Sequence, residues 1–370
     1  MKKKQLAVAV AGALATLVSV PALAQVTMSG NIDVTATSSI VNTTKMTDLS
    51  SGMASTSKLI IQGTEDLGGG LKARFYTETG LTATKHLGTG YASSTASSTN
   101  NVNSEKTSTA IGDRGIYVGV MGGFGSFDMG RIPHITGTAA LGMGGVQNAL
   151  SNATNAGNAH PGQNADVLLS SQKDGRANSS LLFTSPNMNG FTAKVQHSLG
   201  GGDGDGSQGN RTSLNANYTK GDLAVEWMSS KKKAYDVGSL TEAGATPAAT
   251  GSYSVYAAGS KIQETAVGLK YDLKVVVLGI GWAKQTSTTA AGATTEFSAN
   301  GLSATVPIGA WSLSLGTASI TPASTQSYSA YSAGAQYALS KRTSVYGGTR
   351  RNNQVAGKDS LNYFGVNHTF

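Results

Sequence analysis

The chain of 370 residues contains no cysteine, and only 13% of its residues are charged. The absence of cysteine excludes a disulfide scaffold, cysteine-ligated zinc, iron–sulfur clusters and a thiol nucleophile. The charged fraction is well below the roughly 25% of soluble globular domains. Beyond the N-terminus no run approaches the roughly 20 apolar residues of a membrane-spanning helix. Since the mean hydropathy is still mildly negative, at −0.13, the chain is too poor in charge for most soluble proteins and too polar for a helical membrane protein.

The N-terminus has the order of a secretory signal peptide. Three lysines in residues 1–4 precede the apolar run 6–20, and Ala22-Leu23-Ala24 forms an A-x-A cleavage site before Gln25. We therefore expect residues 1–24 to be a signal peptide and residues 25–370 to be a single exported domain. Loss of the three lysines lowers the formal net charge from +8 to +5. This weakens the case for a basic nucleic-acid-binding surface, so no nucleic-acid partner is predicted.

The mature sequence has a period of two. Apolar and polar residues alternate from residue 26 to 36, which indicates a β-strand between an apolar and a polar environment. Sixteen segments show this pattern: 26–36, 57–64, 71–79, 112–121, 125–131, 177–184, 190–198, 211–219, 221–229, 264–271, 273–284, 294–303, 309–319, 329–339, 342–350 and 361–370. No window shows a helical period over several turns.

The connections between these segments alternate in length. Long loops, such as 37–56 and 80–111, are each followed by a short turn, such as 65–70 or 122–124. Transmembrane barrels have this rhythm, because short turns lie in the periplasm and long loops lie outside. A closed barrel also pairs every backbone group, as a bilayer requires. We predict an all-β fold, a sixteen-stranded antiparallel transmembrane β-barrel.

A secreted β-sandwich or solenoid is the alternative fold, since its sheets also have one wet face. Its wet face would carry many Lys and Glu side chains. Here the polar faces hold mostly Ser, Thr, Asn and Gly, and no repeat of fixed length is visible. These features favour the barrel.

The last strand ends in an aromatic residue. Phe364, Val366, His368 and Phe370 share one face of the segment, and a terminal aromatic suits the girdle at the membrane–water interface. Phe370 also resembles the C-terminal signal that the barrel assembly machinery recognises in outer-membrane barrels. Simple anchoring of the last strand would explain it equally well.

Several segments resemble one known family. S-K-L-I-I-Q-G-T-E-D-L-G-G-G-L-K-A-R-F-Y-T-E (57–78) and G-D-R-G-I-Y-V-G-V-M-G-G-F-G-S-F-D-M-G-R (112–131) are similar to strands of the general porins of Gram-negative bacteria, in particular the beta-proteobacterial branch. Segments 178–191 and 337–346 and the final strand also match. The resemblance implies an outer-membrane porin: a water-filled barrel, normally a homotrimer, for passive diffusion of small hydrophilic solutes. It further implies that the third long loop, 132–175, folds inward as a constriction.

The resemblance also implies a ladder of basic residues on the pore wall. Lys58 and Arg114 occupy the places of wall arginines in the second and fourth strands, and Arg176 fits a third. The plain alternative is a solvated polar wall without a selective role.

Three further residue positions follow from the alternation. Arg74 lies on the face of Lys72 and Glu78 and should point into the lumen, because a charge facing lipid near the midplane costs about 2–4 kcal/mol. Glu78 and Asp33 are expected to be acidic residues of the lumen, and Lys72 to be a lumen-facing charge whose selective role stays open.

The expected inward loop is neutral. Residues 132–165 contain no Asp, Glu, Lys or Arg, and the acidic tip motif of enterobacterial porins is absent. Basic residues facing a neutral loop leave a positive potential, which favours anions. We therefore predict a pore that prefers anions, an effect that Glu78 and Asp33 would weaken.

Other functions find less support in the sequence. A solute-specific channel with a saturable site is the main alternative. An outer-membrane enzyme would need an aligned Ser/His/acid set, and an adhesin would need a passenger domain. Neither feature is evident in the sequence. We therefore predict no catalytic residue, no cofactor and no metal site. Lys231–Lys233, in an expected external loop, could meet the phosphates of lipopolysaccharide beside the outer-membrane lipid.

Overall fold

The computed structural model describes residues 25–41, 44–81, 111–135, 176–199, 210–233, 261–289, 291–322, 328–354 and 357–370. The expected signal peptide, residues 1–24, lies outside the described residues. No helix within these ranges is long and apolar enough to cross a membrane.

Seventeen strands make up the described chain. They are β1 (Gln25–Val41), β2 (Thr44–Ser51), β3 (Lys58–Gly68), β4 (Leu71–Gly80), β5 (Gly115–Gly122), β6 (Gly125–Pro133), β7 (Arg176–Thr184), β8 (Phe191–Ser198), β9 (Arg211–Lys220), β10 (Leu223–Lys233), β11 (Lys261–Asp272), β12 (Val277–Thr288), β13 (Thr294–Ile308), β14 (Trp311–Pro322), β15 (Tyr328–Ala338), β16 (Thr343–Gln354) and β17 (Gly357–Thr369).

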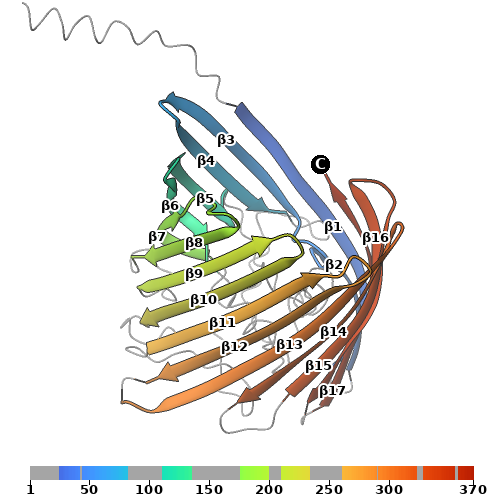
Figure 1. The fold of residues 1–370 in the computed structure, drawn as a ribbon. Coiled ribbons are helices and arrows are strands. Elements are labelled where there is room, and N and C mark those ends of the chain that lie inside the picture. Colours follow the sequence, from blue (N-terminus) through green and yellow to red (C-terminus); the bar gives the residue numbers. More distant parts are fainter. Residues whose placement is uncertain are drawn as a thin grey trace, which may run out of the picture.

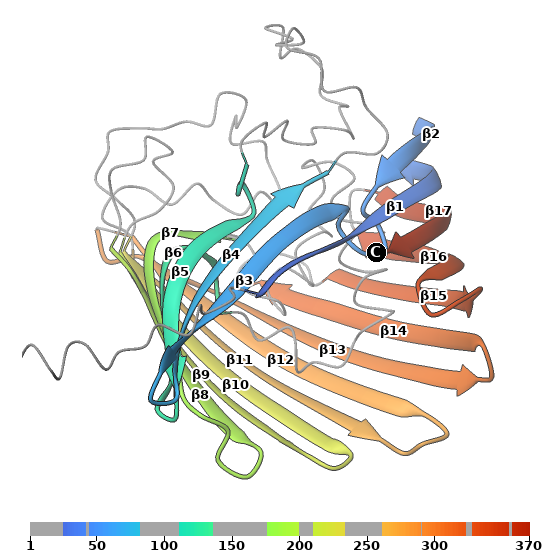
Figure 2. The ribbon, with the colours of Figure 1, turned by 90° about the horizontal axis from the view of Figure 1, so that it is seen from above.

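The strands form one closed antiparallel ring (Figures 1 and 2). Each strand from β3 to β16 pairs with the next along the chain, and β17 pairs with β1. Strand β1 has two partners on its other edge: residues 34–41 pair with β2, and residues 25–31 pair with β3. Strands β2 and β3 therefore share one position. Sixteen positions result, and the predicted sixteen-stranded antiparallel barrel is confirmed.

Two predicted loops are largely strand. The expected loop 37–56 is wrong for most of its length, because β1 continues to Val41 and β2 pairs with it up to Thr44. The segment 351–360, between the last two predicted strands, is likewise mostly strand, with β16 ending at Gln354 and β17 beginning at Gly357. Most residues of these strand ends are polar or charged, so the apolar alternation that marks a strand in lipid is weak there. Lys231–Lys233 also belong to the end of β10 and not to a loop.

The barrel wall is polar inside and apolar outside. On β1 the side chains of Asp33 and Thr35 are fully buried, whereas Ile32 is 43% exposed. This arrangement is the reverse of a soluble domain, in which large apolar side chains are buried. It is the arrangement of a barrel that faces lipid with one side of each strand and an aqueous lumen with the other.

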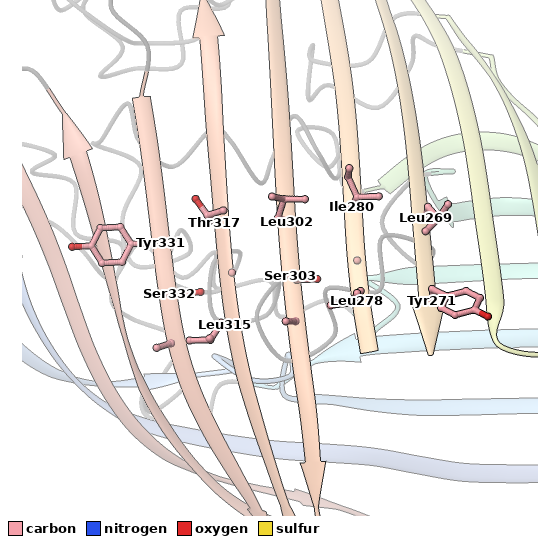
Figure 3. A pocket seen from close by; sticks show the side chains of 14 residues that line it. Leu269, Tyr271, Leu278, Ile280, Leu302, Ser303, Leu315, Thr317, Tyr331 and Ser332 are labelled. Carbon is pink, nitrogen blue, oxygen red and sulfur yellow. The ribbon is translucent and has the colours of Figure 1, made fainter. Parts of the chain in front are cut away.

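The outer apolar surface is continuous across β11 to β15. Leu269, Ile280, Leu302 and Leu315 are exposed there and line a shallow depression (Figure 3). The inward residues of these strands include several buried alanines, among them Ala283. Large side chains are thus on the lipid side and small ones on the lumen side.

The first and last strands meet at the chain termini. The N–H of Gly30 donates to the carbonyl of Phe370, and the N–H of Phe370 donates to the carbonyl of Gly30, both at 3.0 Å. The side chain of Phe370 is exposed on the outer face together with Phe364 and Val366. These two hydrogen bonds close the seam of the ring.

Candidate functional site

A group of charged residues lies on the lumen side of β3 to β7. We call it the basic wall. It comprises five basic residues, Lys58, Arg74, Arg114, Arg131 and Arg176, and three acidic ones, Glu78, Asp113 and Asp128. The basic residues exceed the acidic ones by two charges.

Glu78 is the centre of the basic wall. Its Oε1 lies 2.6 Å from Nε of Arg114, 3.6 Å from Nη2 of Arg176 and 3.8 Å from Nζ of Lys58. The Tyr76 hydroxyl donates to Oε2, and Arg176 also donates to the main-chain carbonyl of Arg114. The Glu78 side chain is 7% exposed, whereas the three basic side chains are 21–29% exposed. The carboxylate therefore lies behind the cations, which present their charge to the lumen.

Arg74 forms a separate ion pair with Asp128. The Nε of Arg74 lies 2.6 Å from Oδ1 of Asp128, its Nη2 contacts Oδ2, and it also donates to Ser126. Gly119 of β5 lies between the two in register, and a Cβ there would meet Oδ1 of Asp128 at 2.1 Å. Glycine therefore leaves the space that this pair occupies. The charge of Arg74 is matched by the buried carboxylate of Asp128, which the sequence did not reveal.

Arg131 joins the group through an irregularity of β6. A regular strand would place Arg131 on the outer face with Met129, but the register shifts between Gly130 and Ile132. Arg131 then donates to the carbonyl of Asp113 at 2.8 Å and to the side chain of Asn178. The Gly-Arg end of segment 112–131 was the only signal for this residue in the sequence.

The beginning of the third long loop is fixed to the lumen face. Of the predicted inward loop, 132–175, residues 136–175 lie outside the described residues. Gln196, an inward residue of β8 that is 1% exposed, accepts the N–H of Ile135 at 2.8 Å and donates to the carbonyl of Pro133 at 3.1 Å. Because β8 is two strands away from β6, the chain after Pro133 crosses the inner face of β7.

Replacing Gln196 by leucine should loosen this attachment. Two buried main-chain groups lose their partner, at a cost of about 1–3 kcal/mol each. We expect more open-channel noise and more frequent spontaneous closures in single-channel recordings. Gln336→Leu is the matched control, because Gln336 of β15 is exposed and its side chain donates to the hydroxyl of Ser344 instead of to buried main chain. Equal noise in both variants would contradict the anchoring role.

Two predicted lumen charges lie apart from the basic wall. Lys72 is exposed at the turn end of β4, two residues before Arg74, and makes none of the contacts above. Asp33 lies on the inner face of β1, and its side chain is fully buried there. Residues 52–57 cover it, and its hydrogen bonds are described below.

Comparisons with known proteins identify one family and, independently, solved structures of the same fold. A family model for Gram-negative porins matches residues 7–357. The solved structure of an anion-selective porin from Comamonas acidovorans is similar to the chain at a TM-score of 0.67 and 19% identity, over 94% of this chain and 100% of that one. OmpT of Vibrio cholerae, in its trimer form, is similar at a TM-score of 0.62 and 13% identity, over 94% of this chain and 99% of that one. OmpF of Salmonella typhi, in complex with daunomycin, is similar at a TM-score of 0.61 and 14% identity, over 94% of this chain and 98% of that one. No protein of curated function matches the chain.

Proposed function

Because the chain belongs to the Gram-negative porin family, we propose that it is a pore that passes small anions in preference to cations. Membership of the family places the protein in the outer membrane, as a channel for passive diffusion of small hydrophilic solutes. The observation that carries the anion preference is the excess of two positive charges on the basic wall. Rings of Arg and Lys in a pore favour anions, and the relative from Comamonas acidovorans is described as anion-selective.

The arrangement of the charges supports this preference. Lys58, Arg114 and Arg176 are partly exposed while Glu78 is buried among them. A permeating anion would therefore meet the cations first. Charges in a lumen with low-dielectric walls also act over a longer distance than charges in bulk water.

A constriction by the third long loop is part of the proposal. The anchoring of Pro133 and Ile135 on Gln196 supports an inward course for the loop. Residues 132–165 carry no charged side chain. A neutral loop facing the basic wall would leave the positive potential uncompensated.

Processing and assembly follow the same proposal. Residues 1–24 act as a signal peptide, three copies associate as a homotrimer, and Phe370 serves as the signal for the barrel assembly machinery. The trimeric form of the Vibrio cholerae relative supports the homotrimer. Lys231 binds lipopolysaccharide phosphates under this proposal, which its exposure on the outer face at the loop end of β10 supports. The protein acts on its solutes only by passage, without a catalytic step.

Swelling of proteoliposomes tests the proposed function. We expect faster entry of a sugar acid than of an amino sugar of equal size, with a neutral sugar between them. Rates should rise linearly with solute concentration. Saturation for one solute would favour the alternative of a solute-specific channel, and faster entry of the amino sugar would contradict the anion preference.

A further inference from the structure

A short segment between β2 and β3 lies inside the barrel. We call residues 52–57 the inner strap. At this segment the backbone pairing on one edge of β1 is interrupted, because β2 ends opposite Val34 and β3 begins opposite Asn31. The main chain of the strap binds inward side chains of β1: Asn31 donates to the carbonyl of Ser55 at 3.1 Å, and Asp33 accepts the N–H of Met53 at 2.9 Å.

The strap also covers apolar residues of the inner wall. Met53, 3% exposed, packs against Tyr346 of β16 and against Leu361 and Tyr363 of β17. These residues alternate with exposed outward ones such as Phe364. The strap therefore lies across the lumen side of β1, β17 and β16, and not on the lipid side.

Asp33 is the fixed point beneath the strap. Besides the N–H of Met53, its carboxylate accepts the hydroxyl of Tyr346 at 2.7 Å, the hydroxyl of Thr35 at 3.1 Å and the side-chain amide of Asn367 at 3.1 Å. A buried carboxylate is costly unless it is well hydrogen-bonded. Here the donors come from three strands and the strap, so the carboxylate joins the strap to the wall.

The end of the strap is tied to the basic wall. The hydroxyl of Ser57 accepts the N–H of Asp33 at 2.9 Å, and the carbonyl of Ser57 accepts the N–H of Leu81 at 2.8 Å. Leu81 follows β4, the strand of Glu78, and the residue after Ser57 is Lys58. The strap thus fixes the main chain on both sides of the contact between Lys58 and Glu78.

From these contacts we infer that the inner strap is a second constriction element of the pore, independent of the third long loop, with Asp33 as its positioning residue. It occupies part of the lumen next to Lys58 and holds that cation against the wall. The inference rests on the proposed function of the protein as an ion-conducting pore.

Thiol modification of a single introduced cysteine tests the inference, since the chain has no cysteine of its own. Ser55→Cys is placed on the strap and Leu49→Cys, on the exposed outer face of β2, is the control. An anionic methanethiosulfonate reagent is added to open channels in planar bilayers. We expect a stepwise loss of open-channel current for Ser55→Cys and none for Leu49→Cys.

Two results would overturn the constriction: no labelling of Ser55→Cys in folded barrels, or complete labelling without loss of current. Absence of any channel in the unmodified protein would instead contradict the proposed function.

The role of Asp33 is tested by adding Asp33→Ala to Ser55→Cys, which should speed labelling severalfold. Asp66→Ala, at the opposite end of β3, is the control and should leave the rate unchanged; an unchanged rate in both would overturn the anchoring role.

Discussion

The triple variant Lys58→Gln, Arg114→Gln, Arg176→Gln should lose the preference for chloride and show a weak preference for potassium. The substitutions leave two basic and three acidic residues on the basic wall, so the sign of its net charge changes. Two unit charges about 4 Å apart interact by about 1 kcal/mol in water and by more near a protein surface. A free-energy difference of about 1.4 kcal/mol changes the ratio of two permeabilities tenfold. We expect the permeability ratio of chloride to potassium to fall about tenfold or more in dilute salt, as read from the reversal potential.

Salt and position provide the controls for this variant. The effect should shrink at about 1 M salt, where the Debye length is only about 3 Å. Lys274→Gln, Lys341→Gln, Arg342→Gln removes the same formal charge from exposed turns, and its permeability ratio should stay near that of the native protein. Equal ratios in the two triple variants would show that net charge, and not the basic wall, sets selectivity.

Gly125→Val should abolish formation of the folded barrel. Gly125 opens β6 with φ of +106°, and a Cβ there would meet the carbonyl oxygen of Thr184 at 2.0 Å. A β-branched residue is strained at positive φ, and the overlap is with main chain that a paired strand cannot easily move. We expect a destabilisation of at least about 3 kcal/mol.

Gly123 of the same turn is the matched control for Gly125. A Cβ on Gly123 meets no atom within 4 Å, and its φ is not positive. Gly123→Val should therefore fold normally. Heat-modifiable migration on SDS gels distinguishes folded barrels from unfolded chains, and equal folded fractions for the two variants would contradict the account of this turn.

The regular parts of the barrel could be predicted from the sequence. Strand β4 keeps strict alternation, so the inward position of Arg74 and Glu78 followed from spacing alone, and the seam at Phe370 is consistent with the outward face predicted for that residue. The strand ends beyond the lipid could not be found in this way. Most residues there are polar or charged, and the apolar period is weak.

The remaining features of the basic wall depend on register and on distant contacts. Asp128 reaches Arg74 because Gly119 is placed between them by two pairings. Arg131 contacts the carbonyl of Asp113 and the side chain of Asn178 next to the irregularity at Gly130. The inner strap depends on Asp33, which lies about 20 residues before it and bonds to residues more than 300 positions later. Neither alternation nor composition reports such contacts.

The low charge content has a simple physical reading in this fold. One face of each strand meets lipid and the other meets water, which brings the mean hydropathy close to neutral. A few charges can then dominate the lumen. Under the proposed function, selectivity depends on the charges of the lumen wall and not on the formal +8 of the whole chain.

The zero-current potential of the native protein in a gradient of potassium chloride tests the central claim most directly. With purified protein in a planar bilayer, we expect a potential of the sign set by chloride as the more permeant ion. A potential of the opposite sign, set by potassium, or one indistinguishable from zero would contradict it.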